Sequence, residues 1–143
     1  MAAVNTQFSI AIHIMAGLGI DPNERCTSTE LSTSVNANPS FVRRVLAKLA
    51  KAGLVNATTG KTGCCSIARS AKSISLLEIY EAVEAPKVFA IHQYPVTKDC
   101  RVSTCIKPAM ENVLNKAQKS LEQSLKGVYL SDVIADVKKL KKD

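Results

Sequence analysis

The sequence lacks tryptophan and has few aromatic residues of any kind. Aromatic residues make up 4% of its 143 residues, whereas hydrophobic residues as a whole make up 46%. A hydrophobic share of this size excludes an intrinsically disordered chain, and the length suits one domain with one modest core. Because aromatics are so few, we expect that core to be aliphatic and the fold to be mainly α-helical.

The sequence also has no hydrophobic run that is long enough to span a bilayer. The apolar stretch of residues 8–20 is shorter than the roughly 20 residues of a membrane-spanning helix. It has neither a preceding Lys or Arg nor a following small-residue cleavage site, as a signal peptide would. No amphipathic segment pairs a basic face with aromatic anchors, which argues against a membrane surface as a partner. We therefore expect a cytoplasmic protein whose five cysteines are reduced at rest.

Acidic residues are absent from residues 40–72, although this stretch contains seven cations. The formal net charge of the whole chain is +7, so the stretch accounts for the entire excess and the rest of the chain is balanced. Concentrated positive charge indicates a polyanionic partner, of which nucleic acid is the commonest. The seven cations are Arg43, Arg44, Lys48, Lys51, Lys61, Arg69 and Lys72.

The stretch begins with a predicted helix over residues 38–53. Asn38 is a favourable N-cap, Pro39 suits the first helical position, and Gly53 can adopt the left-handed conformation that ends a helix. At 100° per residue one face is apolar, with Val42, Val45, Leu46 and Leu49. The opposite face carries Ser40, Arg43, Arg44, Ala47 and Lys51. A short helix with hydroxyl and guanidinium groups near its N-terminus can enter a DNA major groove.

The segments on both sides of this helix predict a winged helix-turn-helix. Thr27 and Glu30 form a capping-box pattern that begins a short helix through residue 35, and residues 36–37 then form a brief turn. Residues 54–58 and 64–69 suit two strands joined by a glycine-containing tip, which gives a two-stranded wing. Lys61 lies at that tip, where it can reach a phosphate or the minor groove.

The C-terminal half predicts a long helix. Ser75 and Glu78 form a second capping-box pattern that begins a helix through residue 83, and residues 87–107 have no clear period. We expect the long helix to begin at Pro108 and to run to residue 125, with a last helix capped by residues 131–132. The long helix has an apolar stripe that needs a partner chain to cover it, made of Met110, Val113, Leu114, Ala117, Leu121 and Leu125.

Taken together, these residues resemble the Rrf2 family of bacterial winged-helix transcription regulators. The likeness is carried, in order, by residues 8–13, 27–31, 38–39, 43–46, 48–55 and 74–84. It implies a homodimer that binds a palindromic operator in double-stranded DNA, and we expect a transcriptional repressor, although the sequence does not give the sign of regulation. Ser40, Arg43, Arg44 and Lys61 fall where that family contacts DNA, and we add Lys48 and Lys51 from the charge pattern. We expect residues 1–86 to bind DNA, 87–107 to form a sensor or linker loop, and 108–143 to hold the dimerisation and C-terminal helices.

The chain departs from the family pattern in two places. The family wing commonly has Gly-Gly followed by an aromatic residue, whereas this chain has Gly63-Cys64-Cys65. Members that hold a [2Fe–2S] cluster have three cysteines before the long helix, whereas only Cys100 and Cys105 are present here. Two thiolates are too few to hold a cluster or a zinc ion. We therefore predict no cofactor, with an iron–sulfur regulator of incomplete ligand set as an alternative.

Cys100 and Cys105 are candidates for thiol-based redox sensing, because the neighbouring cations Lys98, Arg101 and Lys107 favour a thiolate. A purely structural role for both cysteines is the competing interpretation. A nucleophile–base pair of Cys100 with His92 has no third orienting group that can be named, so we do not expect an enzyme. A dimeric interaction module whose basic face is only solvated is a further alternative.

Overall fold

The computed structural model describes residues 6–58 and 63–141. Its contacts divide the chain into two compact units, Met1–Ala85 with Leu125–Asp143 and Pro86–Ser124. We call them the winged-helix unit and the long-helix unit. Within the described ranges, no helix is both long enough and apolar enough to cross a membrane.

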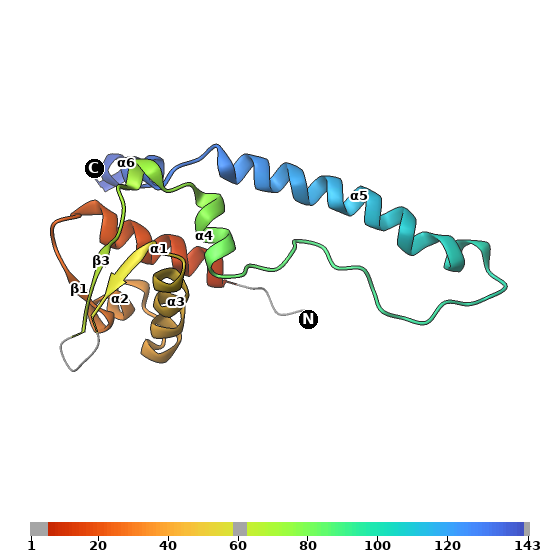
Figure 1. The fold of residues 1–143 in the computed structure, drawn as a ribbon, viewed down its shortest axis with the longest axis horizontal. Helices are drawn as coiled ribbons and strands as arrows, with labels where there is room; N and C mark the ends of the chain where they lie inside the picture. The colour runs from red at the N-terminus through yellow and green to blue at the C-terminus, as the bar shows by residue number, and fades with distance from the viewer. Residues whose placement is uncertain (1–5, 59–62, 142–143) are drawn as a thin grey trace. The chain divides into compact units, whose positions relative to one another are not determined.

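The winged-helix unit is mainly helical, as predicted. Its aliphatic core is built around α1 and α3, with Ile14, Met15 and Leu49 fully buried. The helices α2 and α3 lie beside a small sheet (Figure 1). The helical elements are α1 (Gln7–Ile20), α2 (Ser28–Val35), α3 (Pro39–Lys51), the 3₁₀ turn η1 (Ala71–Ser73), α4 (Leu76–Ala82) and α6 (Leu130–Lys141).

The sheet has three strands rather than the predicted two. The strands β2 (Val55–Ala57) and β3 (Cys64–Ile67) form the predicted antiparallel hairpin. A third strand, β1 (Cys26–Thr27), pairs antiparallel with β3, so that the order is β1-β3-β2. The strand β1 was not predicted because its two residues are too few to show the alternation that indicates a strand. Its second residue, Thr27, is also the N-cap of α2.

The predicted caps around α3 are confirmed. The Asn38 side chain accepts a hydrogen bond from the backbone N–H of Ser40 at 2.8 Å. Gly53 follows the end of α3 with a φ of +79°, in the left-handed region. These local interactions set where α3 begins and ends, and therefore which side chains it presents.

The C-terminal helix α6 belongs to the winged-helix unit, which differs from the predicted grouping of residues 108–143. It packs against α1, and its residues Leu130 and Ile134 are buried in the same core. A Cβ atom at Gly19 of α1 would lie 2.7 Å from Ile134 Cδ1, so glycine permits this close approach. The backbone N–H of Leu130 also donates to the carbonyl of Ile74 at 2.8 Å.

The long helix α5 spans Arg101–Lys126 and contains Pro108, so the prediction that it begins at Pro108 is wrong. The predicted loop 87–107 ends near residue 100 instead. Side chains before the proline stabilise the earlier start, because the Cys100 Sγ accepts from the N–H of Ser103 at 3.4 Å. The Thr104 hydroxyl donates to the carbonyl of Arg101 at 2.9 Å. Pro108 has no N–H for the carbonyl of Thr104 and its ring crowds that carbonyl, which costs about 3 kcal/mol in a helix interior, and α5 nevertheless continues through it.

Candidate nucleic-acid interface

The predicted recognition face of α3 is exposed. Ser40, Arg43 and Arg44 all lie at the surface in the first half of the helix. The Arg43 guanidinium donates to the Ser40 hydroxyl at 3.3 Å, which holds two groups able to contact base edges side by side. The Arg44 guanidinium carbon lies 5.5 Å above the centre of the Phe41 ring, in a cation–π contact. Both arginines are thus oriented by neighbours on their own helix.

The other predicted cations differ in their surroundings. Lys51 is exposed in the last turn of α3. Lys48 is half-buried and its ammonium donates to the side-chain oxygen of Gln7 in α1 at 3.3 Å, so it is engaged within the protein. Lys61 lies outside the described residues. The face therefore consists of Ser40, Arg43, Arg44 and Lys51, with Lys48 at its flank.

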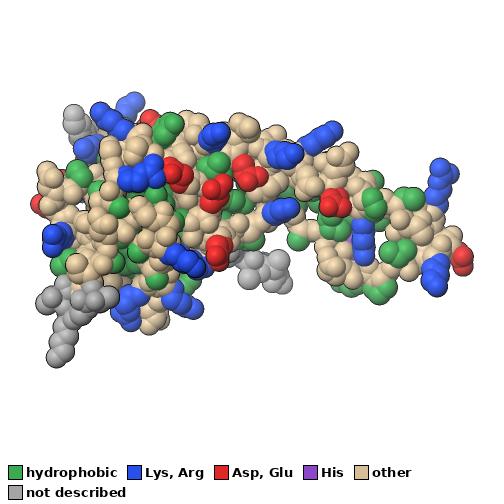
Figure 2. Space-filling view, viewed as in Figure 1, with side chains coloured by type: hydrophobic (Ala, Val, Ile, Leu, Met, Phe, Trp, Pro, Cys, Tyr) green, Lys and Arg blue, Asp and Glu red, His purple; other side chains and the backbone are tan. Residues whose placement is uncertain are grey.

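The electrostatic environment of this face is basic. No acidic residue occurs between Leu31 and Leu77 of the sequence. Among the described residues, the one ion pair is between Arg69 and Glu78 at 2.8 Å, and it involves no residue of α3. Figure 2 shows Lys and Arg side chains over α3, whereas acidic side chains gather over α4. The arginines of α3 therefore keep their charge available for an external anion.

A groove separates α3 from the wing, with a volume of about 350 Å³. Two residues that the sequence pattern did not single out, Ser28 at the start of α2 and Thr58 after β2, line it beside Arg43. Neither residue stands out in the local sequence, because the groove forms only where α2, α3, β2 and β3 converge. Its full lining is Ser28, Arg43, Leu46, Ala47, Ala57, Thr58, Gly63 and Cys65.

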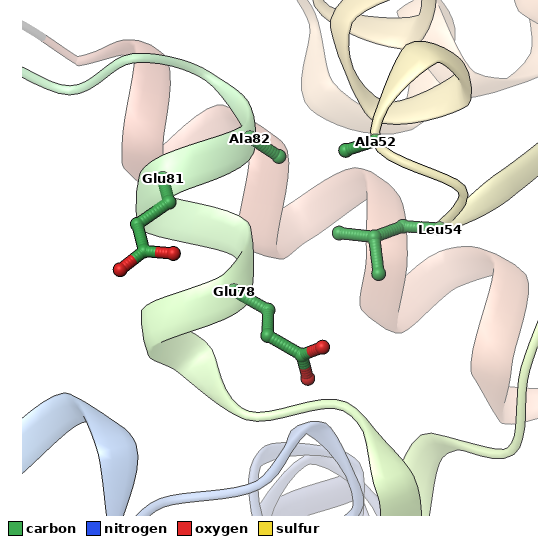
Figure 3. A pocket seen from close by; sticks show the side chains of 5 residues that line it. All are labelled: Ala52, Leu54, Glu78, Glu81 and Ala82. Carbon is green, nitrogen blue, oxygen red and sulfur yellow. The ribbon is translucent and has the colours of Figure 1, made fainter.

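A second hollow of about 280 Å³ lies between the end of α3 and α4. Figure 3 shows two carboxylates there, Glu78 and Glu81, with the apolar side chains of Ala52 and Leu54 across from them. Glu78 already binds Arg69 and accepts the N–H of Ser75 at 2.9 Å, which completes the predicted capping box. A carboxylate held in this way caps a helix and is not available for acid–base chemistry.

Glu78 should make folding stability depend on pH in the acidic range. Burial raises its pKa, but hydrogen bonds from Arg69 and Ser75 outweigh burial and lower the pKa below its ordinary value of 4.5. Its stabilising contribution is therefore complete above pH 4.5 and is lost as the pH falls through the folded-state pKa. We expect Glu78→Gln to reduce the free energy of unfolding at neutral pH and to flatten its decline in acid.

Urea unfolding at pH 7 and about pH 3 measures this difference. Glu81→Gln is the matched control, since it removes a carboxylate from the same helix that forms no ion pair with any described residue. Equal pH profiles for wild type and Glu78→Gln would contradict the assigned role.

The long-helix unit has almost no interior. None of the residues of α5 is buried, and Val113 in its apolar stripe is 64% exposed. The segment before α5 is held to it by hydrogen bonds, including Val88 N–H to Gln118 at 3.1 Å and Lys107 ammonium to the Tyr94 carbonyl at 2.5 Å. The same segment exposes further large apolar side chains, among them Phe89 at 59%. This surface lacks the burial that stabilises a helix in water.

Cys100 and Cys105 are both exposed, but α5 separates them. The Cys100 sulfur accepts a hydrogen bond from a backbone N–H in the first turn of α5, and Cys105 lies within the helix. At a rise of about 1.5 Å per residue, the step of five positions from one cysteine to the other separates them by about 7.5 Å along the helix axis. This exceeds the Cα separation of about 7 Å that a disulfide can bridge. His92 does not pair with Cys100 among the described contacts, because its Nδ1 accepts the N–H of Tyr94 at 3.3 Å.

The donor set does not fit an iron–sulfur cluster. In the part of the chain that the structure describes, no three His, Cys, Asp or Glu residues are grouped so that they could hold a metal ion. A [2Fe–2S] cluster takes four protein ligands, whereas the start of α5 offers the two thiols of Cys100 and Cys105. The prediction that this chain holds no cofactor stays a prediction.

Comparison with known proteins agrees with the winged-helix geometry. The profile of the Rrf2 family, described as "Iron-dependent Transcriptional regulator", matches residues 4–136. The chain belongs to the Rrf2 family. It is 34% identical over 132 residues to YwnA of Bacillus subtilis (strain 168), covering 92% of this chain and 96% of YwnA, whose name places it among HTH-type transcriptional regulators. Rrf2 proteins are transcriptional regulators, and the protein is not an enzyme.

Solved structures share the fold. A regulator structure from Lactobacillus plantarum superposes with a TM-score of 0.81 at 21% identity, covering 93% of this chain and 90% of that one. The cysteine regulator CymR of B. subtilis gives a TM-score of 0.67 at 18% identity, covering 94% and 98%. The fold prediction, a mainly α winged helix-turn-helix with a long C-terminal helix, is thus confirmed. Regulators of this family bind DNA and commonly act as dimers.

Proposed function

We propose that this Rrf2 protein is a homodimeric transcriptional repressor that reads a palindromic operator with α3. The observation that carries the proposal is the exposed face of α3, where Arg43 and Ser40 lie side by side with no acidic partner among the described residues. A guanidinium in such a position can donate two hydrogen bonds to a guanine edge in the major groove. The exposed Lys51 on the same helix can contact a phosphate of the backbone.

The dimer is supported by the exposed apolar surface of the long-helix unit. A 26-residue helix with no buried residue is not stable in water by itself. A second copy offers the same stripe, so packing the two stripes together across a two-fold axis would cover both at once. Two α3 helices related by such an axis would meet half-sites one helical turn apart, about 34–36 Å, or a multiple of that spacing.

Titration of labelled DNA from upstream of the protein's own gene tests the proposal. We expect specific binding at least about 1,000-fold tighter than binding to a scrambled duplex of equal length at the same salt concentration. The affinity should fall steeply with salt, because phosphate contacts release counterions. Equal affinity for the two duplexes would reject operator recognition, and no binding to either would favour the interaction module.

We also propose that Cys100 and Cys105 make operator binding sensitive to thiol modification. Cys100 accepts the N–H of Ser103, and the Ser103 hydroxyl in turn accepts the N–H of Thr97 at 2.7 Å. Oxidation or alkylation of the sulfur would disturb this link between α5 and the segment before it. Because α5 holds the two thiols apart, the modification would be a sulfenic acid, a mixed disulfide or a bond to the partner subunit, rather than a bridge between them.

Alkylation with iodoacetamide tests whether modification of Cys100 and Cys105 weakens operator binding. We expect modified wild type to lose about tenfold in operator affinity, and the Cys100→Ser/Cys105→Ser double variant to be unaffected by the same treatment. The Cys64→Ser variant is a control that keeps both thiols. If the double variant stays fully sensitive, the thiols of α5 are not responsible.

A further inference from the structure

Two cysteines outside α5 face each other across the sheet of the winged-helix unit. Cys26 of β1 is the direct antiparallel partner of Cys65 of β3. Directly opposed residues point to the same face of a sheet, with Cα atoms about 4.5–5.5 Å apart. This falls inside the range of about 4.4–6.8 Å that a disulfide requires. Both carry free thiols; Cys65 belongs to the core cluster of the unit, and the half-buried Cys26 packs against that cluster.

The neighbouring Cys64 lies on the other face of the same strand. Its partner in β1 is Thr27, so its side chain alternates away from the Cys26–Cys65 pair. The register therefore selects one pair among the three cysteines of the sheet. No sequence pattern indicates this, since Cys26 and Cys65 lie 39 positions apart.

The pair also borders the proposed DNA interface. Cys65 is 5% exposed and forms part of the groove wall that Arg43 and Thr58 line. Cys26 directly precedes Thr27, whose hydroxyl accepts the N–H of Glu30 and caps α2. A covalent link here would join the wing to the start of α2 beside α3.

We infer that Cys26 and Cys65 form a reversible disulfide that lowers operator affinity. The oxidant is a low-molecular-weight disulfide, RSSR. The more exposed Cys26 thiolate attacks one sulfur of RSSR, which forms a mixed disulfide and releases RS⁻. The Cys65 thiolate then attacks the Cys26 sulfur and releases the second RS⁻. Two protein S–H bonds are replaced by one S–S bond, and the two protons leave with two RSH.

Forming the bond must move the strands. Opposed Cβ atoms in a sheet lie about 4.5–5.5 Å apart, whereas a disulfide draws them to about 3.5–4.5 Å. Closing that difference pulls β3 toward β1 and shifts the groove wall against Arg43. The helix α3 and the wing must both fit the same stretch of DNA, so a shift between them weakens binding.

The surroundings slow the oxidation of the pair. Burial raises the pKa of Cys65, and the neighbouring sulfurs of Cys64 and Cys26 raise it further. Burial also raises the pKa of Cys26, as do the carboxylates of Glu30, Glu24 and Asp21. Thiols held in the protonated form exchange slowly, so the reaction should take hours at neutral pH.

Non-reducing peptide mapping after incubation with oxidised glutathione tests the inference on the full-length protein. We expect wild type to yield a Cys26–Cys65 linked peptide two hydrogens lighter than its two component peptides, and its operator affinity to fall about tenfold. Dithiothreitol should restore both. Cys64→Ser is the matched control, one residue away on the opposite face, and should behave as wild type.

In the Cys100→Ser/Cys105→Ser background, which removes the exposed thiols of α5, the additional Cys26→Ser or Cys65→Ser change should abolish the linked peptide and preserve operator affinity after oxidation. The Cys100→Ser/Cys105→Ser variant should still respond. A map in which Cys26 and Cys65 stay reduced while other thiols react would overturn the inference, as would a linked protein that binds the operator as tightly as before. The effect on affinity rests on the proposed DNA binding, but the map detects the disulfide without DNA, so the two proposals fail separately.

Discussion

Replacing Arg43 and Arg44 together by alanine is expected to abolish operator preference while leaving the protein folded and dimeric. Both side chains are exposed and neither contributes to the core, so folding should not suffer. Removing the side chain that reads a base costs about 1–3 kcal/mol of binding free energy, and the dimer carries two copies of the face. Operator affinity should fall to the level of the scrambled duplex, as measured by fluorescence anisotropy.

The single variants should distinguish base recognition by Arg43 from the contact that Arg44 makes with Phe41. Arg43→Lys keeps the charge but loses the planar fork, so it should lose specificity while the salt dependence stays similar. Arg44→Ala also removes the guanidinium that stacks on Phe41, so its effect includes freeing that ring. These differences follow from the contacts that each arginine makes on α3.

The matched control is Lys72→Ala/Lys138→Ala, which removes the same charge from exposed positions on η1 and α6. These two elements pack against each other. The control variant should bind the operator and the scrambled duplex slightly more weakly than wild type does, by the same factor. An unchanged operator preference in the Arg43/Arg44 variant would show that α3 is not the recognition helix.

Replacing Leu114 and Leu121 by aspartate is expected to dissociate the dimer. The two leucines lie about 20° apart around α5, near the middle of the apolar stripe. Burying an unpaired carboxylate costs several kcal/mol, and about 3 kcal/mol per site would raise the dimer dissociation constant by at least two orders of magnitude. Sedimentation at micromolar concentration should show a monomer, and operator affinity should fall with it because one α3 meets only one half-site.

The control for this change is Asn112→Asp/Gln123→Asp. These exposed positions lie about 160–180° from Leu114 around the same helix, and the variant adds the same two negative charges. It should stay dimeric. A leucine variant that sediments as a dimer would place the interface elsewhere on the protein.

The sequence by itself determined the parts of the fold that depend on neighbours within about four residues. The cap at Asn38, the left-handed Gly53 and the box of Ser75 with Glu78 all lie where the pattern predicted them. The exposed face of α3 follows from the same local period. The positive charge of this face was predictable as well, because the charged residues can be counted in the sequence without knowing the fold. The candidate DNA interface was therefore largely predictable.

Tertiary structure decided what depends on contacts between distant segments. The bond from Lys48 to Gln7, the packing of α6 on α1 and the start of α5 at Arg101 were not predicted. The strand β1 is too short to show a period, and it exists because β3 supplies its hydrogen-bond partner. Only this pairing places Cys26 opposite Cys65, since strand register is set by which residues meet across the sheet and not by their order in the chain.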